Sequence, residues 1–243
     1  GDFGESLISK RDIRDAIERP LRNSIALGTI TVLLLVPLTV SLGLISGIKA
    51  DSMVDSGIGA VALLAYAIPM FITATMLVYL FALRWGLLPA VSLLPSGASP
   101  WRAPDVIAIP VLTLLAGSSA YFIRLTRAST IGVMRSEFVE AAVLRGVGPV
   151  RLLVHHVLPS VLPPIIQVLV LYVAALLGGV IIVETTVGYP GIGLELTRAV
   201  AARDIPLVQA IAMLSAFAVV FGNVLADAAV IALTPRLRAE LWS

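Results

Sequence analysis

Long apolar runs separated by short polar connectors make up most of this sequence. A helix needs about 20 apolar residues to cross a hydrocarbon layer about 30 Å thick. Five runs meet that length: Ser24–Ile48, Gly57–Leu83, Asp105–Ile123, Val161–Val183 and Pro206–Leu233. The pattern therefore predicts an all-α integral membrane protein with five transmembrane helices.

Prolines fall inside several of these runs, among them Pro37, Pro69 and Pro110. A transmembrane helix tolerates proline because neighbouring helices satisfy the backbone groups that it frees. We expect a kink at each of the three positions.

The first 23 residues are polar. Residues 10–24, KRDIRDAIERPLRNS, place apolar side chains at Ile13, Ala16 and Ile17, a spacing typical of a short interfacial helix. The chain then divides into an external or interfacial segment (1–23), a transmembrane domain (24–235) and a cytoplasmic tail (236–243).

Composition supports the membrane assignment. Only 13% of the residues are charged, about half the usual share of a soluble domain. The net charge of +2 is too small to indicate a nucleic-acid partner. Because the chain has no cysteine, it has neither disulfides nor thiolate metal sites.

Lysine and arginine leave the orientation open when all of them are counted. Cytoplasmic loops carry an excess of these residues. When residues 1–23 are set aside, one side of the membrane holds more basic residues than the other, which places the connector 124–160 and the C-terminus in the cytoplasm. The richer side holds Lys49, Arg124, Arg127, Arg135, Arg145, Arg151, Arg236 and Arg238, and the other side holds Arg84, Arg102, Arg198 and Arg203.

The connector 124–160 contains the stretch EFVEAAVLRGVGPVRLLVHHVLP, residues 137–159. Ser136 is a suitable N-cap for a first short helix, and Gly146 is suited to end it. Pro149 favours the start of a second short helix, and Pro159 is expected to close it. Such a bend is suited either to docking a soluble partner or to lying on the lipid surface, and the pattern alone does not choose.

This stretch resembles the EAA motif of permease subunits of binding-protein-dependent ABC importers. The motif reads E-A-A, three residues, G, nine residues, an apolar residue, one more, and L-P. The matching positions are Glu140, Ala141, Ala142, Gly146, Leu158 and Pro159. One departure is His156, which stands where the family usually has an apolar residue.

Other stretches resemble the dipeptide, oligopeptide and nickel branch of that family. They are GDFG at 1–4, IPMF at 68–71, VETTVGYPGIG at 183–193, and Asn223 and Asp227 followed by TPRLR at 234–238. Val187 and Thr234 depart from the branch pattern. The resemblance is to the first (B-type) of two paralogous subunits, and it implies a further N-terminal helix that is absent from this sequence.

The resemblance implies an ABC importer type I transmembrane domain in a bacterial-type cell membrane. The residues implied to dock an ATPase, within coupling helices 136–159, are Glu137, Glu140, Ala141, Ala142, Arg145, Gly146, Leu158 and Pro159. Its implied partners are a paralogous permease subunit, two ATPase subunits or one fused pair, and an extracytoplasmic substrate-binding protein. The implied cargo is a peptide or a peptide-like solute; dipeptides, oligopeptides, nickel complexes and haem all remain open.

The external turn before residue 194 is a second candidate site. It comprises Glu184, Tyr189, Pro190, Gly191 and Gly193. This turn either reaches toward the translocation path or simply reverses the chain. Glu184 lies near the end of a span, where a charge needs only water or a polar partner.

No enzymatic constellation is recognisable. The phosphate loop G-x-x-x-x-G-K-[ST] is absent, so ATP and Mg are expected to bind in the partner ATPases. His155 and His156 are adjacent and point about 100° apart on a helix, and we expect no metal, cofactor or catalytic residues in this chain. An ion-coupled secondary transporter is the alternative function, although such proteins usually bury ionisable groups near the midplane and carry inverted repeats.

Overall fold

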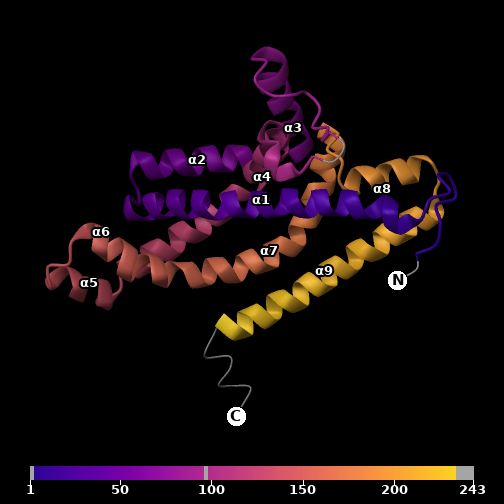
Figure 1. Ribbon diagram of the computed structural model, residues 1–243. Coiled ribbons are helices and arrows are strands. Elements are labelled where there is room, and N and C mark those ends of the chain that lie inside the picture. Colours follow the sequence, from indigo (N-terminus) through magenta and orange to yellow (C-terminus); the bar gives the residue numbers. More distant parts are fainter. Residues whose placement is uncertain (1–2, 96–97, 234–243) are drawn as a thin grey trace, which may run out of the picture. The chain divides into compact units, whose positions relative to one another are not determined.

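The computed structural model describes residues 3–95 and 98–233, without the side chains of residues 174, 175, 177, 225–227 and 229–233. Regular structure in this part is helical, apart from one isolated antiparallel bridge between Glu5 and Asp12. Figure 1 shows the helices along the chain. They are α1 (Ile13–Ile48), α2 (Met53–Ala67), α3 (Met70–Leu77), the π-helix η1 (Val78–Arg84), the 3₁₀-helix η2 (Pro100–Arg102), α4 (Pro104–Met134), α5 (Glu137–Leu144), α6 (Pro149–Leu152), the π-helix η3 (Leu153–Val157), α7 (Leu158–Val187), α8 (Ile192–Ala201) and α9 (Ile205–Leu233).

All five predicted spans coincide with helices. Within the described residues, four helical stretches are long and apolar enough to cross a membrane, and a bent pair of helices makes a fifth when it is counted as one span. The bent pair joins α2 to α3 and η1, and its two arms differ in direction by 102°. The expected kink at Pro69 is therefore wrong in degree, because the helix breaks there.

Proline chemistry explains the break. Pro69 has extended backbone angles at the N-cap of α3, and its carbonyl accepts the first N–H groups of that helix, from Ile72 and Thr73. Because proline lacks an N–H and disfavours helical angles in the residue before it, a new helix starts here. Pro37 and Pro110, by contrast, lie inside the continuous helices α1 and α4.

The chain forms two compact units, each assembled from three segments. Unit 1 comprises residues 1–33, 68–117 and 173–222, and unit 2 comprises 34–67, 118–172 and 223–243. A buried cluster in unit 1 joins α1, α8 and α9 through Ile13, Ile17, Ile192, Ala199, Leu207, Ala210 and Ile211. A smaller cluster in unit 2 joins α2 to α4 through Ala62, Ala120 and Ile123.

The N-terminal segment differs from its prediction. Its expected short interfacial helix is continuous with the first span, because α1 runs unbroken from Ile13 to Ile48. Residues 4–12 before it form a tight reversal, in which Ser6 and Arg11 share a backbone hydrogen bond and Lys10 has a φ of 56°.

Asp204 fastens this reversal to the start of α9. Its carboxylate accepts hydrogen bonds from the Ser6 hydroxyl and, at 3.2 Å, from the backbone N–H of Leu7. It also accepts the backbone N–H of Leu207, as an N-cap does. The Ser6 hydroxyl, followed by these backbone donors, holds the pKa of Asp204 below its usual value although burial opposes the shift.

Candidate functional site

The connector between α4 and α7 contains the bend that Gly146 and Pro149 predicted (Figure 1). α5 ends in two backbone hydrogen bonds, from Gly146 N to Val143 O at 2.9 Å and from Val147 N to Ala142 O at 3.2 Å. Gly146 has a φ of 77°, which confirms its role as the left-handed C-terminal residue. Pro149 opens α6 directly after Gly148, also as expected.

Ser136 occupies the N-cap position of α5 without making the expected cap. Its hydroxyl makes no hydrogen bond to α5 and donates instead to the carbonyl of Val133 in the last turn of α4. Only Arg135 and Ser136 separate the two helices. The hydroxyl therefore fastens the turn to the helix before it.

The prediction that Pro159 closes a second short helix is wrong. α6, η3 and α7 follow one another without a break, and Pro159 is the second residue of α7. In the π-helical turn, Leu158 N bonds to Leu153 O, five residues back. This wider turn accommodates a residue that has no N–H to donate and whose ring would crowd the carbonyl four residues earlier.

α5 turns one face into unit 2 and leaves the other exposed. Val139 and Ala142 are buried, with 2% and 6% of their surfaces exposed. Two carboxylates and three large apolar side chains lie on the free face, which we call the α5 surface: Glu137, Glu140, Phe138, Val143 and Leu144.

The predicted docking residues therefore fall into separate environments. Ala141 and Leu158 are half-buried, and Ala142 lies in the interior. Arg145, Gly146 and Pro159 are exposed alongside both glutamates. Leu144 is the most exposed of the three apolar side chains on the α5 surface, at 81%.

The turn before α8 forms a buried polar cluster in unit 1. The Glu184 carboxylate accepts the backbone N–H of Gly193 at 2.7 Å and that of Leu194, in the first turn of α8. It also accepts the hydroxyl hydrogen of Ser24 on α1. Negative charge is stabilised at the N-terminus of a helix, which favours the carboxylate at this position. Through these hydrogen bonds one carboxylate links α7, α1 and α8.

Gly191 is the residue that lets this carboxylate approach. A Cβ at position 191 would lie 2.0 Å from Glu184 Oε1, and its φ of −106° is open to any residue. The glycine is therefore required for space. Gly193 is similarly crowded, with a Cβ falling 2.6 Å from the backbone of Ile181.

Tyr189 and Pro190 complete the cluster through Asn23. The Tyr189 hydroxyl donates to the carbonyl of Asn23 at 3.0 Å, and the Asn23 amide donates to the carbonyl of Pro190 at 2.8 Å. Neither Glu184 nor Tyr189 exposes any surface. The structure thus brings the predicted turn residues together, with their polar groups directed at the protein.

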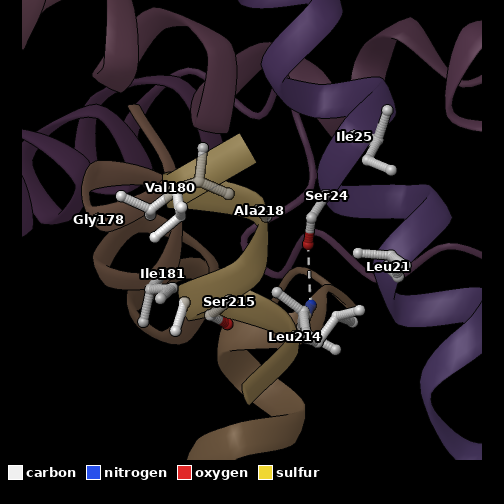
Figure 2. Close-up of a pocket in the computed structure, with 13 residues that line it drawn as sticks. Leu21, Ser24, Ile25, Gly178, Val180, Ile181, Leu214, Ser215 and Ala218 are labelled. Carbon is white, nitrogen blue, oxygen red and sulfur yellow. Dashed lines mark hydrogen bonds between the residues drawn. The ribbon is translucent and has the colours of Figure 1, made fainter. Parts of the chain in front are cut away.

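An apolar hollow of about 440 Å³ lies beside this cluster (Figure 2). Leu21, Ile25, Val180, Ile181 and Leu214 are among its lining residues. The Ser24 hydroxyl at its edge is already engaged, since it accepts the N–H of Ile192 at 2.8 Å. The hollow offers few groups to hydrogen-bond a polar solute.

Sequence reasoning missed an ion pair in unit 2 between Asp55 of α2 and Arg127 of α4. Arg127 Nε and Nη2 donate to the two carboxylate oxygens at 2.7 and 2.6 Å. The available signal was an acidic residue and a basic residue, each near the edge of an apolar run. Another missed signal was the spacing Gly43-x-x-x-Gly47 in α1, which often marks close helix contact in membranes.

Several resemblance positions lie outside the described residues. They are Gly1 and Asp2, the side chain of Asp227, the stretch TPRLR at 234–238 and the tail 236–243.

Comparison with known proteins defines the class. A model of the family described as "binding-protein-dependent transport system inner membrane component" matches residues 39–239. The chain belongs to this family and is a multi-pass permease of the bacterial inner membrane. This assignment decides against the ion-coupled secondary transporter.

Curated relatives match nearly the whole chain. A probable peptide ABC transporter permease protein of Sinorhizobium fredii is 29% identical over 240 residues, which are 98% of this chain and 76% of that protein. The dipeptide transport system permease protein DppB of Bacillus subtilis is 29% identical over 238 residues, covering 98% of this chain and 75% of its own.

Solved structures show the same fold at low identity. A chain of the MetNI methionine ABC transporter in an inward-facing conformation has a TM-score of 0.71 and 14% identity, covering 89% of this chain and 95% of its own. A chain of an amino acid ABC transporter crystallised with histidines has a TM-score of 0.61 and 17% identity, with coverages of 87% and 91%. The fold is therefore that of ABC importer transmembrane domains.

Proposed function

We propose that this chain passes peptides or peptide-like solutes across the membrane, together with a paralogous permease subunit. An extracytoplasmic binding protein delivers the solute, and ATP is hydrolysed in two separate ATPase subunits or one fused pair. The names of the relatives in Sinorhizobium and Bacillus support a peptide as the cargo. We propose no catalytic, cofactor or metal site for this chain.

The α5 surface is the proposed ATPase-docking site, and its composition is the observation that carries this proposal. Phe138 and Leu144 expose large apolar areas beside Glu137 and Glu140. Such a mixture is unusual for a water-facing helix and typical of a protein interface with apolar anchors and charged edges. Arg145, Gly146, Leu158 and Pro159 extend the site, while Ala141 and Ala142 let α5 pack closely on its own unit.

The turn before α8 is proposed to set the shape of the outer end of the path. Glu184, Tyr189, Pro190, Gly191 and Gly193 are bonded to α1 and α8 or packed against them, which favours a scaffolding role over direct contact with solute. ATP binding would then bias the transporter between inward-open and outward-open states. Moving such an equilibrium from 1:99 to 99:1 takes about 5.5 kcal/mol.

The test is ATP-driven uptake of a radiolabelled dipeptide by the complete transporter in proteoliposomes. Gly146→Ala should lower the uptake severalfold, because a left-handed backbone costs a non-glycine residue about 1–2 kcal/mol and so shifts the end of α5. Gly148→Ala is the matched control. Gly148 has a φ of −64°, which alanine adopts freely, and both positions have open space for a Cβ.

Two outcomes would contradict the proposal at different levels. Unchanged uptake in Gly146→Ala would argue against docking through this bend. A wild-type complex that hydrolyses ATP without moving any di- or oligopeptide would argue against the peptide cargo.

A further inference from the structure

The ion pair between Asp55 and Arg127 is built more completely than a surface salt bridge. Besides its two bonds to Arg127, the Asp55 carboxylate accepts the Ser46 hydroxyl hydrogen and, at 2.9 Å, the backbone N–H of Asp51. Its side chain is 8% exposed, against 32% for Arg127. One carboxylate thus joins the end of α1, the start of α2 and the C-terminal part of α4.

The geometry favours a fixed arrangement of these three helices. A planar guanidinium that meets a carboxylate through two parallel bonds specifies orientation as well as distance. Loss of either partner would leave the other charge partly buried and uncompensated, a costly state. Asp51 adds a weaker ionic contact to Arg127 at 3.6 Å but is itself 89% exposed.

Helix packing next to the pair fixes α1 to α4 as well. A Cβ on Gly43 would lie 2.4 Å from Cβ of Thr126, and one on Gly47 would lie 2.5 Å from Cβ of Thr130. The two threonines flank Arg127 on α4. The backbones of α1 and α4 are therefore in close contact along one helical turn next to the ion pair.

α4 is also the helix that carries α5. Arg127 lies seven positions before the end of α4 at Met134, and α5 starts at Glu137. All of these residues belong to unit 2. A displacement applied to α5 therefore reaches the ion pair through the turn at Arg135 and Ser136 and the last part of α4.

We propose that Asp55 and Arg127 are positioning residues for energy coupling. They hold α1 and α2 on α4, so that a displacement of α5 by the ATPase moves all three helices together. Without the pair, α4 would follow α5 while α2 lags, and ATP would be hydrolysed with less solute moved. This inference rests on the proposed docking of the ATPase at α5.

The decisive measurement is the number of solute molecules transported per ATP hydrolysed. The complete transporter is reconstituted in proteoliposomes, with a radiolabelled dipeptide as the probe. Arg127→Gln and Asp55→Asn should each lower this ratio by about 2- to 30-fold, the range expected for residues that modulate coupling. ATP hydrolysis itself should continue in both variants.

Arg124→Gln is the matched control. Arg124 lies three residues earlier on α4 and is exposed, and the substitution removes the same charge. Its coupling ratio should equal that of the wild type. Arg127→Lys, which keeps the charge but loses the two-pronged contact, should give an intermediate ratio.

Failure of this inference is distinguishable from failure of the proposed function. A wild-type complex without ATP-driven dipeptide uptake would overturn the function. A functional wild type whose variants lose transport and ATP hydrolysis in proportion, or keep the wild-type ratio, would overturn the coupling role. Failure of Arg127→Gln, Arg127→Lys and Asp55→Asn all to assemble would also overturn it, because the pair would then serve folding alone.

Discussion

Asp204 shows how one side chain secures a segment distant in sequence. It lies 198 positions from Ser6, yet its carboxylate orders the reversal at residues 4–12 through hydroxyl and backbone donors. Because these donors stabilise the ionised form, they lower its pKa, and the stabilisation depends on that form being present.

The lowered pKa predicts how this attachment depends on pH. A carboxyl group with a folded-state pKa below its ordinary value of about 3.9 contributes stability above that value. The contribution is lost as pH falls from there through the folded-state pKa. Hydrogen–deuterium exchange of residues 4–12, corrected for intrinsic rates, should show protection at neutral pH that declines below about pH 4.

Asp204→Asn is the reference for this experiment, because an amide does not titrate. The segment should exchange faster than wild type at neutral pH in this variant, with little further change on acidification. Equal protection in the two proteins at neutral pH would show that the carboxylate is not what holds the segment.

Among the helices, the contact of α1 with α4 depends on residues that have almost no side chain. Without a hydrophobic driving force between helices in lipid, close backbone approach provides much of the attraction. Gly43 and Gly47 provide that approach by facing Thr126 and Thr130. Their spacing was visible in the sequence, but their partner helix was not.

Gly43→Ala should destabilise the protein. The added Cβ would meet the Cβ of Thr126, which cannot rotate away, and overpacking typically costs about 1–3 kcal/mol. That outweighs the gain in helix propensity of at most about 1 kcal/mol. Gly132→Ala on α4, where a Cβ meets open space, supplies the control. The thermal unfolding midpoint of the purified complex should fall only for Gly43→Ala, and equal midpoints would contradict the packing argument.

Spans and turns were predictable to different extents for physical reasons. An apolar run of 20 residues determines a transmembrane helix by itself, and a glycine with positive φ ends a helix by itself, as Gly146 does. Pro69 and Pro159 have the same local chemistry but different outcomes, because a new helix starts after Pro69 whereas a π-helical turn takes Pro159 into a continuous helix. The pairing of Asp55 with Arg127 spans 72 positions, and no local pattern encodes it.

At the scale of the whole molecule, the bent pair Met53–Arg84 decides how often the chain crosses the membrane. The chain crosses five times if this pair is one span and four times if it is not. Between residues 4–12 and the α5 surface lie α1, this pair and α4, so a pair that crosses puts those two regions on opposite sides of the membrane.

Single cysteines can test this crossing, since the sequence contains none. Leu7→Cys and Val91→Cys should react with a membrane-impermeant maleimide in intact spheroplasts, whereas Met53→Cys and Glu140→Cys should react only after permeabilisation. All four positions are exposed. A permeant maleimide provides the control for sites covered by a partner, because it reaches both sides. If Val91→Cys is labelled from the same side as Met53→Cys, the bent pair enters and leaves the membrane on one side. The α5 surface would then lie on the side opposite to the one that ATPase docking requires.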